Sequence, residues 1–276
     1  MNIIDTYNDI VTYFQNKTFD LLTWRCYASN ISPVLSEKVE NDANAYDLNE
    51  QVIPVINTAL QSIEKLEETH NSFISVTNRL DEKFTELFGF ELDADIILYL
   101  GLCNGAGWAT NLNGRKVVLL GIEKIIELNW CDEDSMLTLI YHELGHIWHS
   151  IAGNLYYTTD KKNEKSLWQL YQEGVAMYCE QLLCNNFNHY HQDKNGWLDW
   201  CLENEVSIKT EYLRRMNNFE STQDFFGDWC SYMGYTDVGY FLGCEFIKTL
   251  AIKYSLKEIA NLDIKVIASE FENFTK

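Results

Sequence analysis

The sequence has few prolines, few basic residues and no long apolar run. Its 276 residues include only two prolines, and neither a low-complexity tract nor an internal repeat is detectable, which argues against linkers and repeat architectures. Lys and Arg number 21 against 41 Asp and Glu, so the net charge of -20 opposes binding to nucleic acids and anionic membranes. No apolar run is long enough to cross a membrane, and no basic segment followed by an apolar one opens the chain. We therefore expect a protein that neither spans a membrane nor is exported.

Cysteine pairs with the C-x-x-C spacing are also missing. The eight cysteines are scattered along the chain, which is typical of free thiols in a reducing compartment and predicts a cytoplasmic location. Hydrophobic residues make up 46% of the chain and aromatic residues 14%, enough for a large core. The composition therefore predicts a globular protein.

The apolar pattern predicts an α+β fold, mostly helical with a small mixed sheet. Apolar residues in the stretch 51–88 recur at steps of three and four, as in amphipathic helices, and further helices are expected at 135–152, 166–184, 197–217 and 238–254. A β-branched run at 94–102 and two strand-like segments around Asn113-Gly114 predict strands and a hairpin. We expect one domain of two lobes, with a helical scaffold (1–90), a sheet with a helix beside it (91–153) and a helical C-terminal lobe (154–276).

Half of the six histidines lie in the stretch Ile140–Ser150, IYHELGHIWHS. His142 and His146 are four residues apart, so on a helix both project from one face and can share a metal ion. Glu143 is offset by about 100° around the helix axis and can accept a proton from water beside that ion. This is the H-E-x-x-H pattern of metallopeptidases. His149 fits no ligand spacing, and second-shell, substrate-contact and packing roles remain open for it.

Catalytic zinc usually has three protein ligands and keeps one position for water, so a third ligand is needed. The H-x-x-G-x-x-H continuation is absent. Glu173, 27 residues after His146 and inside a predicted helix, is the preferred candidate because apolar residues flank it and would make an unpaired charge costly. Gly174 beside it favours a close approach of two helices. Glu180, two turns further on, is the alternative ligand.

The motif HELGH followed by EGVA resembles the gluzincin group of zinc metallopeptidases. The resemblance covers about forty residues, and the stretch Val238–Ala251 also resembles a Gly-Tyr-x-x-Gly element of predicted zinc-dependent proteases. It implies a zincin-like fold, in which the edge strand of a sheet holds an extended substrate in a cleft between two lobes. Lys116–Gly121 is the expected edge strand, and an interior strand is the alternative.

The sequence thus predicts a zinc-dependent peptidase that acts on a peptide or protein through water activated by the metal, with Glu143 as general base. Tyr240, flanked by Gly239 and Gly243, is the candidate donor to the oxyanion, with Tyr235 as the alternative. A zinc hydrolase for another bond and an inactive binding or regulatory protein with the same fold remain open. The oligomeric state is not predicted.

Overall fold

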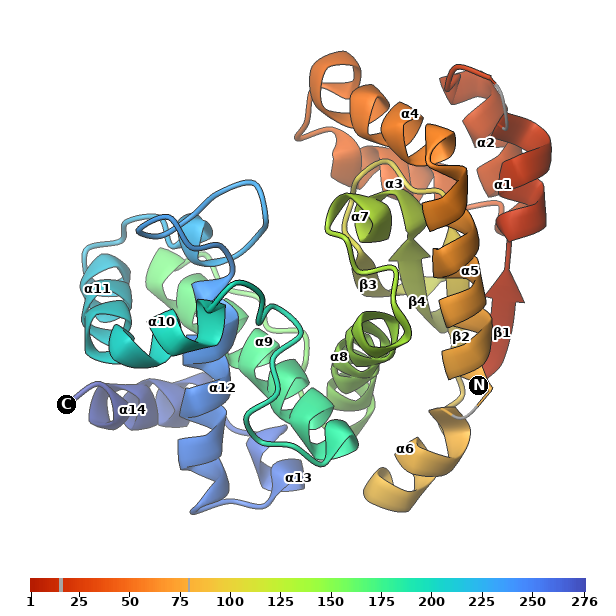
Figure 1. Ribbon diagram of the computed structural model, residues 1–276. Coiled ribbons are helices and arrows are strands. Elements are labelled where there is room, and N and C mark those ends of the chain that lie inside the picture. The colour runs from red at the N-terminus through yellow and green to blue at the C-terminus, as the bar shows by residue number, and fades with distance from the viewer. Residues whose placement is uncertain (15–16, 79) are drawn as a thin grey trace. The chain divides into compact units, whose positions relative to one another are not determined.

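The computed structural model describes residues 1–14, 17–78 and 80–276. The chain is mostly helical with one mixed four-stranded sheet, which confirms the predicted α+β class. It divides into two compact units, Met1–Glu143 and Leu144–Lys276, and the division falls inside one continuous helix, α8. Figure 1 shows the elements in chain order.

The first unit contains the sheet and the N-terminal helices. Its strands are β1 (Asn2–Asp5), β2 (Asp95–Tyr99), β3 (Gly107–Leu112) and β4 (Arg115–Gly121). Its helices are α1 (Tyr7–Phe14), α2 (Leu21–Ile31), α3 (Leu35–Ala43), the π-helix η1 (Leu48–Val52), α4 (Ile53–Gln61), α5 (Ile63–Thr77), α6 (Leu80–Phe88), α7 (Ile122–Glu127) and the first half of α8 (Glu133–Ala152).

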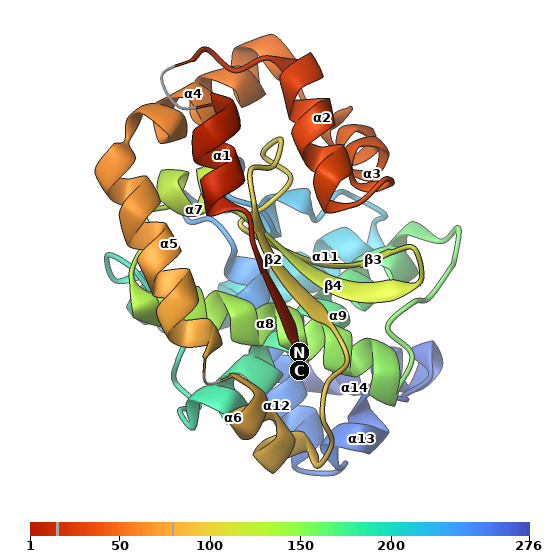
Figure 2. The same ribbon diagram turned by 90° about the vertical axis from the view of Figure 1, so that its right-hand side faces the viewer.

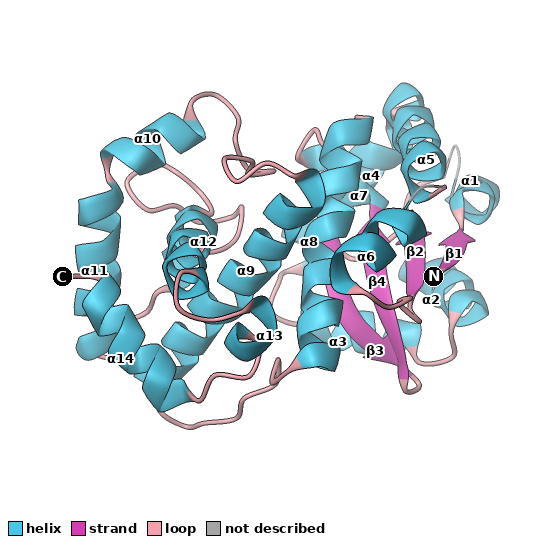
Figure 3. Cartoon of the chain, turned by 90° about the horizontal axis from the view of Figure 1, so that it is seen from below, coloured by secondary structure: helices cyan, strands magenta, loops and turns pink. Residues whose placement is uncertain are grey.

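The strand order in the sheet is β1-β2-β4-β3, as Figure 3 shows. β1 and β4 both run parallel to β2, whereas β3 is antiparallel to β4. All five residues of β2 are buried, which is typical of a central strand covered on both faces. The predicted hairpin is present (Figure 2): Asn113 and Gly114 have φ values of 51° and 84°, the left-handed conformations that a two-residue turn of this kind requires.

Of the two alternatives for Lys116–Gly121, an edge strand and an interior strand, the structure has the interior strand. This segment belongs to β4, which is paired on both sides, with β2 and with β3. Its last five residues are all buried, as expected of an interior strand covered on both faces. The edge next to β4 is therefore β3, Gly107–Leu112.

The second unit is helical. After the end of α8 come α9 (Lys162–Cys184), α10 (Trp197–Glu203), α11 (Glu205–Asn217), the 3₁₀ turn η2 (Gln223–Phe225), α12 (Val238–Ala251), α13 (Leu256–Ile259) and α14 (Ile264–Phe274). The single helix predicted for 197–217 is two helices, broken at Asn204. The Asn204 side-chain amide donates to the Trp200 carbonyl at 2.9 Å, a local hydrogen bond that ends the first helix.

Helices α9 and α12 pack side by side in this unit (Figure 1). A methyl group on Gly174 would lie 2.3 Å from the Gly243 carbonyl oxygen, and one on Gly243 would lie 2.5 Å from the Leu170 carbonyl oxygen. Neither position has room for a side chain. This close backbone contact is the reason for glycine in the middle of α9, where it costs about 1 kcal/mol relative to alanine.

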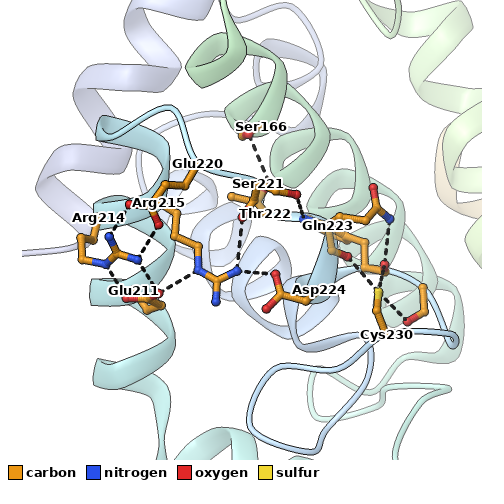
Figure 4. A network of polar contacts seen from close by, with 12 residues as sticks. Ser166, Glu211, Arg214, Arg215, Glu220, Ser221, Thr222, Gln223, Asp224 and Cys230 are labelled. Carbon is orange, nitrogen blue, oxygen red and sulfur yellow. Dashed lines mark hydrogen bonds and ion pairs between the residues drawn. The ribbon is translucent and has the colours of Figure 1, made fainter.

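The segment before α12 is tied to α11 by a network of polar contacts, shown in Figure 4. Arg215 forms ion pairs with Glu211 and Asp224, and Arg214 forms ion pairs with Glu211 and Glu220. Nearer α12, the Gly227 backbone N–H donates to Asp237 at 2.8 Å, and burial raises the pKa of that carboxyl group. These contacts fix the segment that leads into α12 and Tyr240.

Candidate metal centre

Helix α8 carries the H-E-x-x-H residues. It begins after Asp132, whose carboxylate accepts the Ser135 backbone N–H at 2.9 Å and caps the first turn. His142 is buried, with 4% of its surface exposed, and the side chain of His146, one turn later, is 13% exposed. The two imidazoles thus lie on one face of a long, capped helix, as the sequence predicts.

Glu173 comes from α9. Its Oε2 lies 3.2 Å from His146 Nε2, and its side chain is 21% exposed. One donor atom each from His142, His146 and Glu173 can be chosen so that all three lie within 4.8 Å of one another. Two imidazole nitrogens and a carboxylate oxygen are the donor types found in catalytic zinc sites. These three residues could therefore hold a metal ion.

Gly145 lets α8 approach α9 closely next to His146 and Glu173. A methyl group on Gly145 would lie 3.0 Å from the Cα and carbonyl oxygen of Ala176, and equally far from the Cβ of Cys179. Gly145 directly precedes His146, and Ala176 lies three residues after Glu173. The small residues thus set the separation of the two helices that carry these side chains.

Glu143 points toward strand β3. Its Oε2 accepts the backbone N–H of Ala109 at 2.7 Å, and 6% of the residue is exposed. A methyl group on Gly107 would lie 2.5 Å from Glu143 Oε1, so this carboxylate occupies the space that a side chain at position 107 would need. The edge strand therefore fixes the orientation of Glu143 through a hydrogen bond and through the absence of a side chain.

A second histidine and carboxylate cluster lies further along α9. Glu180 is completely buried; its Oε2 lies 2.8 Å from His191 Nδ1 and its Oε1 3.3 Å from His189 Nε2. Glu180, the alternative third ligand, groups with His142 and His191 within 4.8 Å. His189 and His191 were not among the residues predicted from the sequence. The His-x-His doublet was the available signal, but it lies in the loop after α9, where no ligand-spacing rule points back to Glu180.

The two tyrosine candidates differ in their surroundings. Tyr240 lies in the first turn of α12, and its ring centroid is 6.3 Å from that of His191 and 5.6 Å from that of Phe226. Tyr235 stacks on Trp200 with ring centroids 4.1 Å apart. Tyr240 is thus next to the second cluster, whereas Tyr235 packs on an aromatic ring.

His149 is buried in the second unit. It has no exposed surface, and its ring packs edge-on against Tyr171 at 5.5 Å. Burial, followed by the nearby His146, lowers the pKa of His149 to about 3, so the ring is neutral at physiological pH. Of the roles left open for it, packing has direct support in these contacts.

The chain matches no known protein family, no curated protein and no solved structure. Among the helices of the described residues, none combines the length and the apolar character needed to span a membrane.

Proposed function

We propose that the chain is a zinc-dependent metallopeptidase of the gluzincin type with a zincin-like fold, in which His142, His146 and Glu173 hold the zinc ion. The observation that carries this proposal is the convergence of these donors within 4.8 Å on two closely packed helices. Two imidazoles and one carboxylate leave a coordination position open, as catalysis requires, whereas structural zinc sites are usually closed by four ligands.

Glu143 is the proposed general base. When bound, zinc supplies Lewis acidity, which polarises a carbonyl group and makes water more acidic. Glu143 accepts a proton from the attacking water as the oxygen–carbon bond forms, and it delivers that proton to the leaving amine as the carbon–nitrogen bond breaks. The Ala109 N–H holds one carboxylate oxygen in place, which keeps the base in one orientation.

The substrate is proposed to be a peptide or protein in extended form. Among the described residues, β3 pairs with β4 alone and so forms an edge of the sheet. Because Glu143 occupies the Ala109 N–H, a peptide that adds to this edge as a further strand would pair with other residues of β3 and lie beside that carboxylate. Tyr240 remains the proposed donor to the oxyanion that develops during attack.

A reducing compartment, such as the cytoplasm, is the proposed location. All eight cysteines are free thiols, and several are buried in apolar surroundings.

The test is hydrolysis of a quenched fluorescent peptide library by zinc-loaded protein. We expect Glu143→Gln to lower kcat/KM by about 10²- to 10⁴-fold, the usual contribution of a general base, with zinc content unchanged. Glu164→Gln is the matched control, because Glu164 lies on α9 and pairs with Lys161. A Glu143→Gln variant as active as the parent would show that Glu143 is not the base.

A further inference from the structure

The cluster around Glu180 is a polar site inside the second unit. Glu180 has no exposed surface, and its two carboxylate oxygens face two imidazoles, His191 at 2.8 Å and His189 at 3.3 Å. A buried carboxylate is costly unless its charge is compensated, either by a protonated imidazole or by a divalent cation. Imidazole nitrogens and a carboxylate are also ligands that zinc and cobalt accept.

Gln192 contacts the side of the His191 ring opposite Glu180. Its side-chain nitrogen lies 2.8 Å from His191 Nε2, so the amide donates to the ring and the ring proton resides on Nδ1, facing Glu180. In this arrangement Gln192 Oε1 is buried without a hydrogen-bond partner among the residues that the structure describes. A buried oxygen of this kind is energetically unfavourable.

A cation at His191 Nδ1 would reverse the roles of donor and acceptor between these two side chains. The ring proton would then reside on Nε2, and rotation of the Gln192 amide by about 180° would let its Oε1 accept that proton. Histidines that bind metals almost always donate their other N–H to an acceptor of this type. After this rotation, the pair of side chains would have the arrangement expected around a bound cation.

We propose that Glu180 and His191, together with His142, form a second divalent-cation site. Donor atoms of these three residues lie within 4.8 Å of one another. His142 also belongs to the first donor group, but Glu173 does not belong to the second. A chain that has lost the first position through Glu173 therefore still binds an ion at the second.

Cobalt(II) titration tests this inference, with binding followed by visible absorption and by metal content per chain. We expect Glu173→Gln to bind one cobalt ion, and the double variant Glu173→Gln/Glu180→Gln to bind it at least about 10-fold more weakly, as loss of a ligand requires. Glu173→Gln/Glu164→Gln, which changes a carboxylate elsewhere on α9, should bind like Glu173→Gln. Equal affinity of Glu173→Gln and Glu173→Gln/Glu180→Gln, or no binding by Glu173→Gln, would overturn the proposal.

Circular dichroism and thermal unfolding establish whether each variant is folded. If the Glu180 variant does not fold, His191→Gln in the Glu173→Gln background makes the same test, and the same weakening is expected. The readout is binding and not hydrolysis, so it is independent of the proposed peptidase activity. An ion lost in Glu180→Gln but retained in Glu173→Gln would support the second site and contradict the first.

Discussion

Glu143 and Ala109 are joined by a 2.7 Å hydrogen bond from the backbone N–H of the edge strand to the carboxylate of helix α8. The proposed general base is therefore held by the same strand that we expect to pair with the substrate. This relationship requires glycine at position 107, because Glu143 fills the space above it.

Gly107→Ala should displace Glu143. The added methyl group would lie 2.5 Å from Glu143 Oε1 and 2.7 Å from its Cγ, well inside contact distance, so the carboxylate must move. We expect kcat/KM on a peptide substrate to fall by about 100-fold, since small misplacements of reacting groups have effects of this size. Zinc content should be unchanged. Asn111→Asp, at an exposed position of the same strand, is the control, and equal losses in both variants would argue against a specific effect.

Removal of the metal should lower stability. Binding to the folded state alone stabilises it by about 2.7 kcal/mol at a free zinc concentration 100 times the dissociation constant. We therefore expect a chelator to lower the unfolding temperature and added zinc to restore it, measured by calorimetry. His146→Ala removes a ligand that only the first donor group contains, so the unfolding temperature of this variant should respond less to zinc than that of the parent. A parent protein whose unfolding temperature does not respond to zinc would contradict the prediction.

Gly174→Ala should destabilise the second unit. The new methyl group would lie 2.3 Å from the Gly243 carbonyl oxygen, in the contact between α9 and α12. Overpacking of this kind costs about 1–3 kcal/mol, against a gain of about 1 kcal/mol in helix propensity. Urea unfolding should therefore show a net loss of stability. Gln172→Ala, two residues away on α9 and partly exposed, is the comparison, and a Gly174→Ala variant more stable than the parent would show that the helices can separate freely.

The acid dependence of stability should include a contribution from Glu211. Hydrogen bonds from Arg214 and then Arg215 lower its pKa to about 2. Because this value is below that of the unfolded chain, the stabilisation is complete above about pH 4.5 and is lost as the pH falls toward 2. We expect Glu211→Gln to reduce the free energy of unfolding at pH 7 by about 1 kcal/mol or less, since the group is partly solvent-screened. Urea titrations at several pH values should show this difference shrinking in acid; a constant difference would be inconsistent with it.

The features that the sequence predicted well are those with local signals. The limits of α8 follow from a capping aspartate and an apolar stripe, and the hairpin follows from Asn113-Gly114. The break at Asn204 was not predicted, because no glycine or proline marks it. Strand β1 was also not predicted: it has only four residues, most of them exposed, and it forms through pairing with the distant β2.

For the candidate site, too, the features with local signals were predictable and those that depend on distant parts of the chain were not. The spacing of His142, Glu143 and His146 on one helix is a local signal, and the choice of Glu173 over Glu180 depended on its apolar neighbours. Whether β3 or β4 forms the edge depends on strand order, which a single strand's sequence does not encode. The grouping of Glu180 with His191 depends on the path of the loop after α9, which only the folded chain determines.

The proposed function requires that His142, His146 and Glu173 hold one zinc ion. Anomalous diffraction at the zinc absorption edge, from crystals of the zinc-loaded protein, tests it most directly. We predict one strong anomalous peak about 2.0–2.2 Å from a nitrogen of each histidine and an oxygen of Glu173. A fully loaded crystal with no peak at that position, or with Glu173 turned away from the peak, would contradict the account.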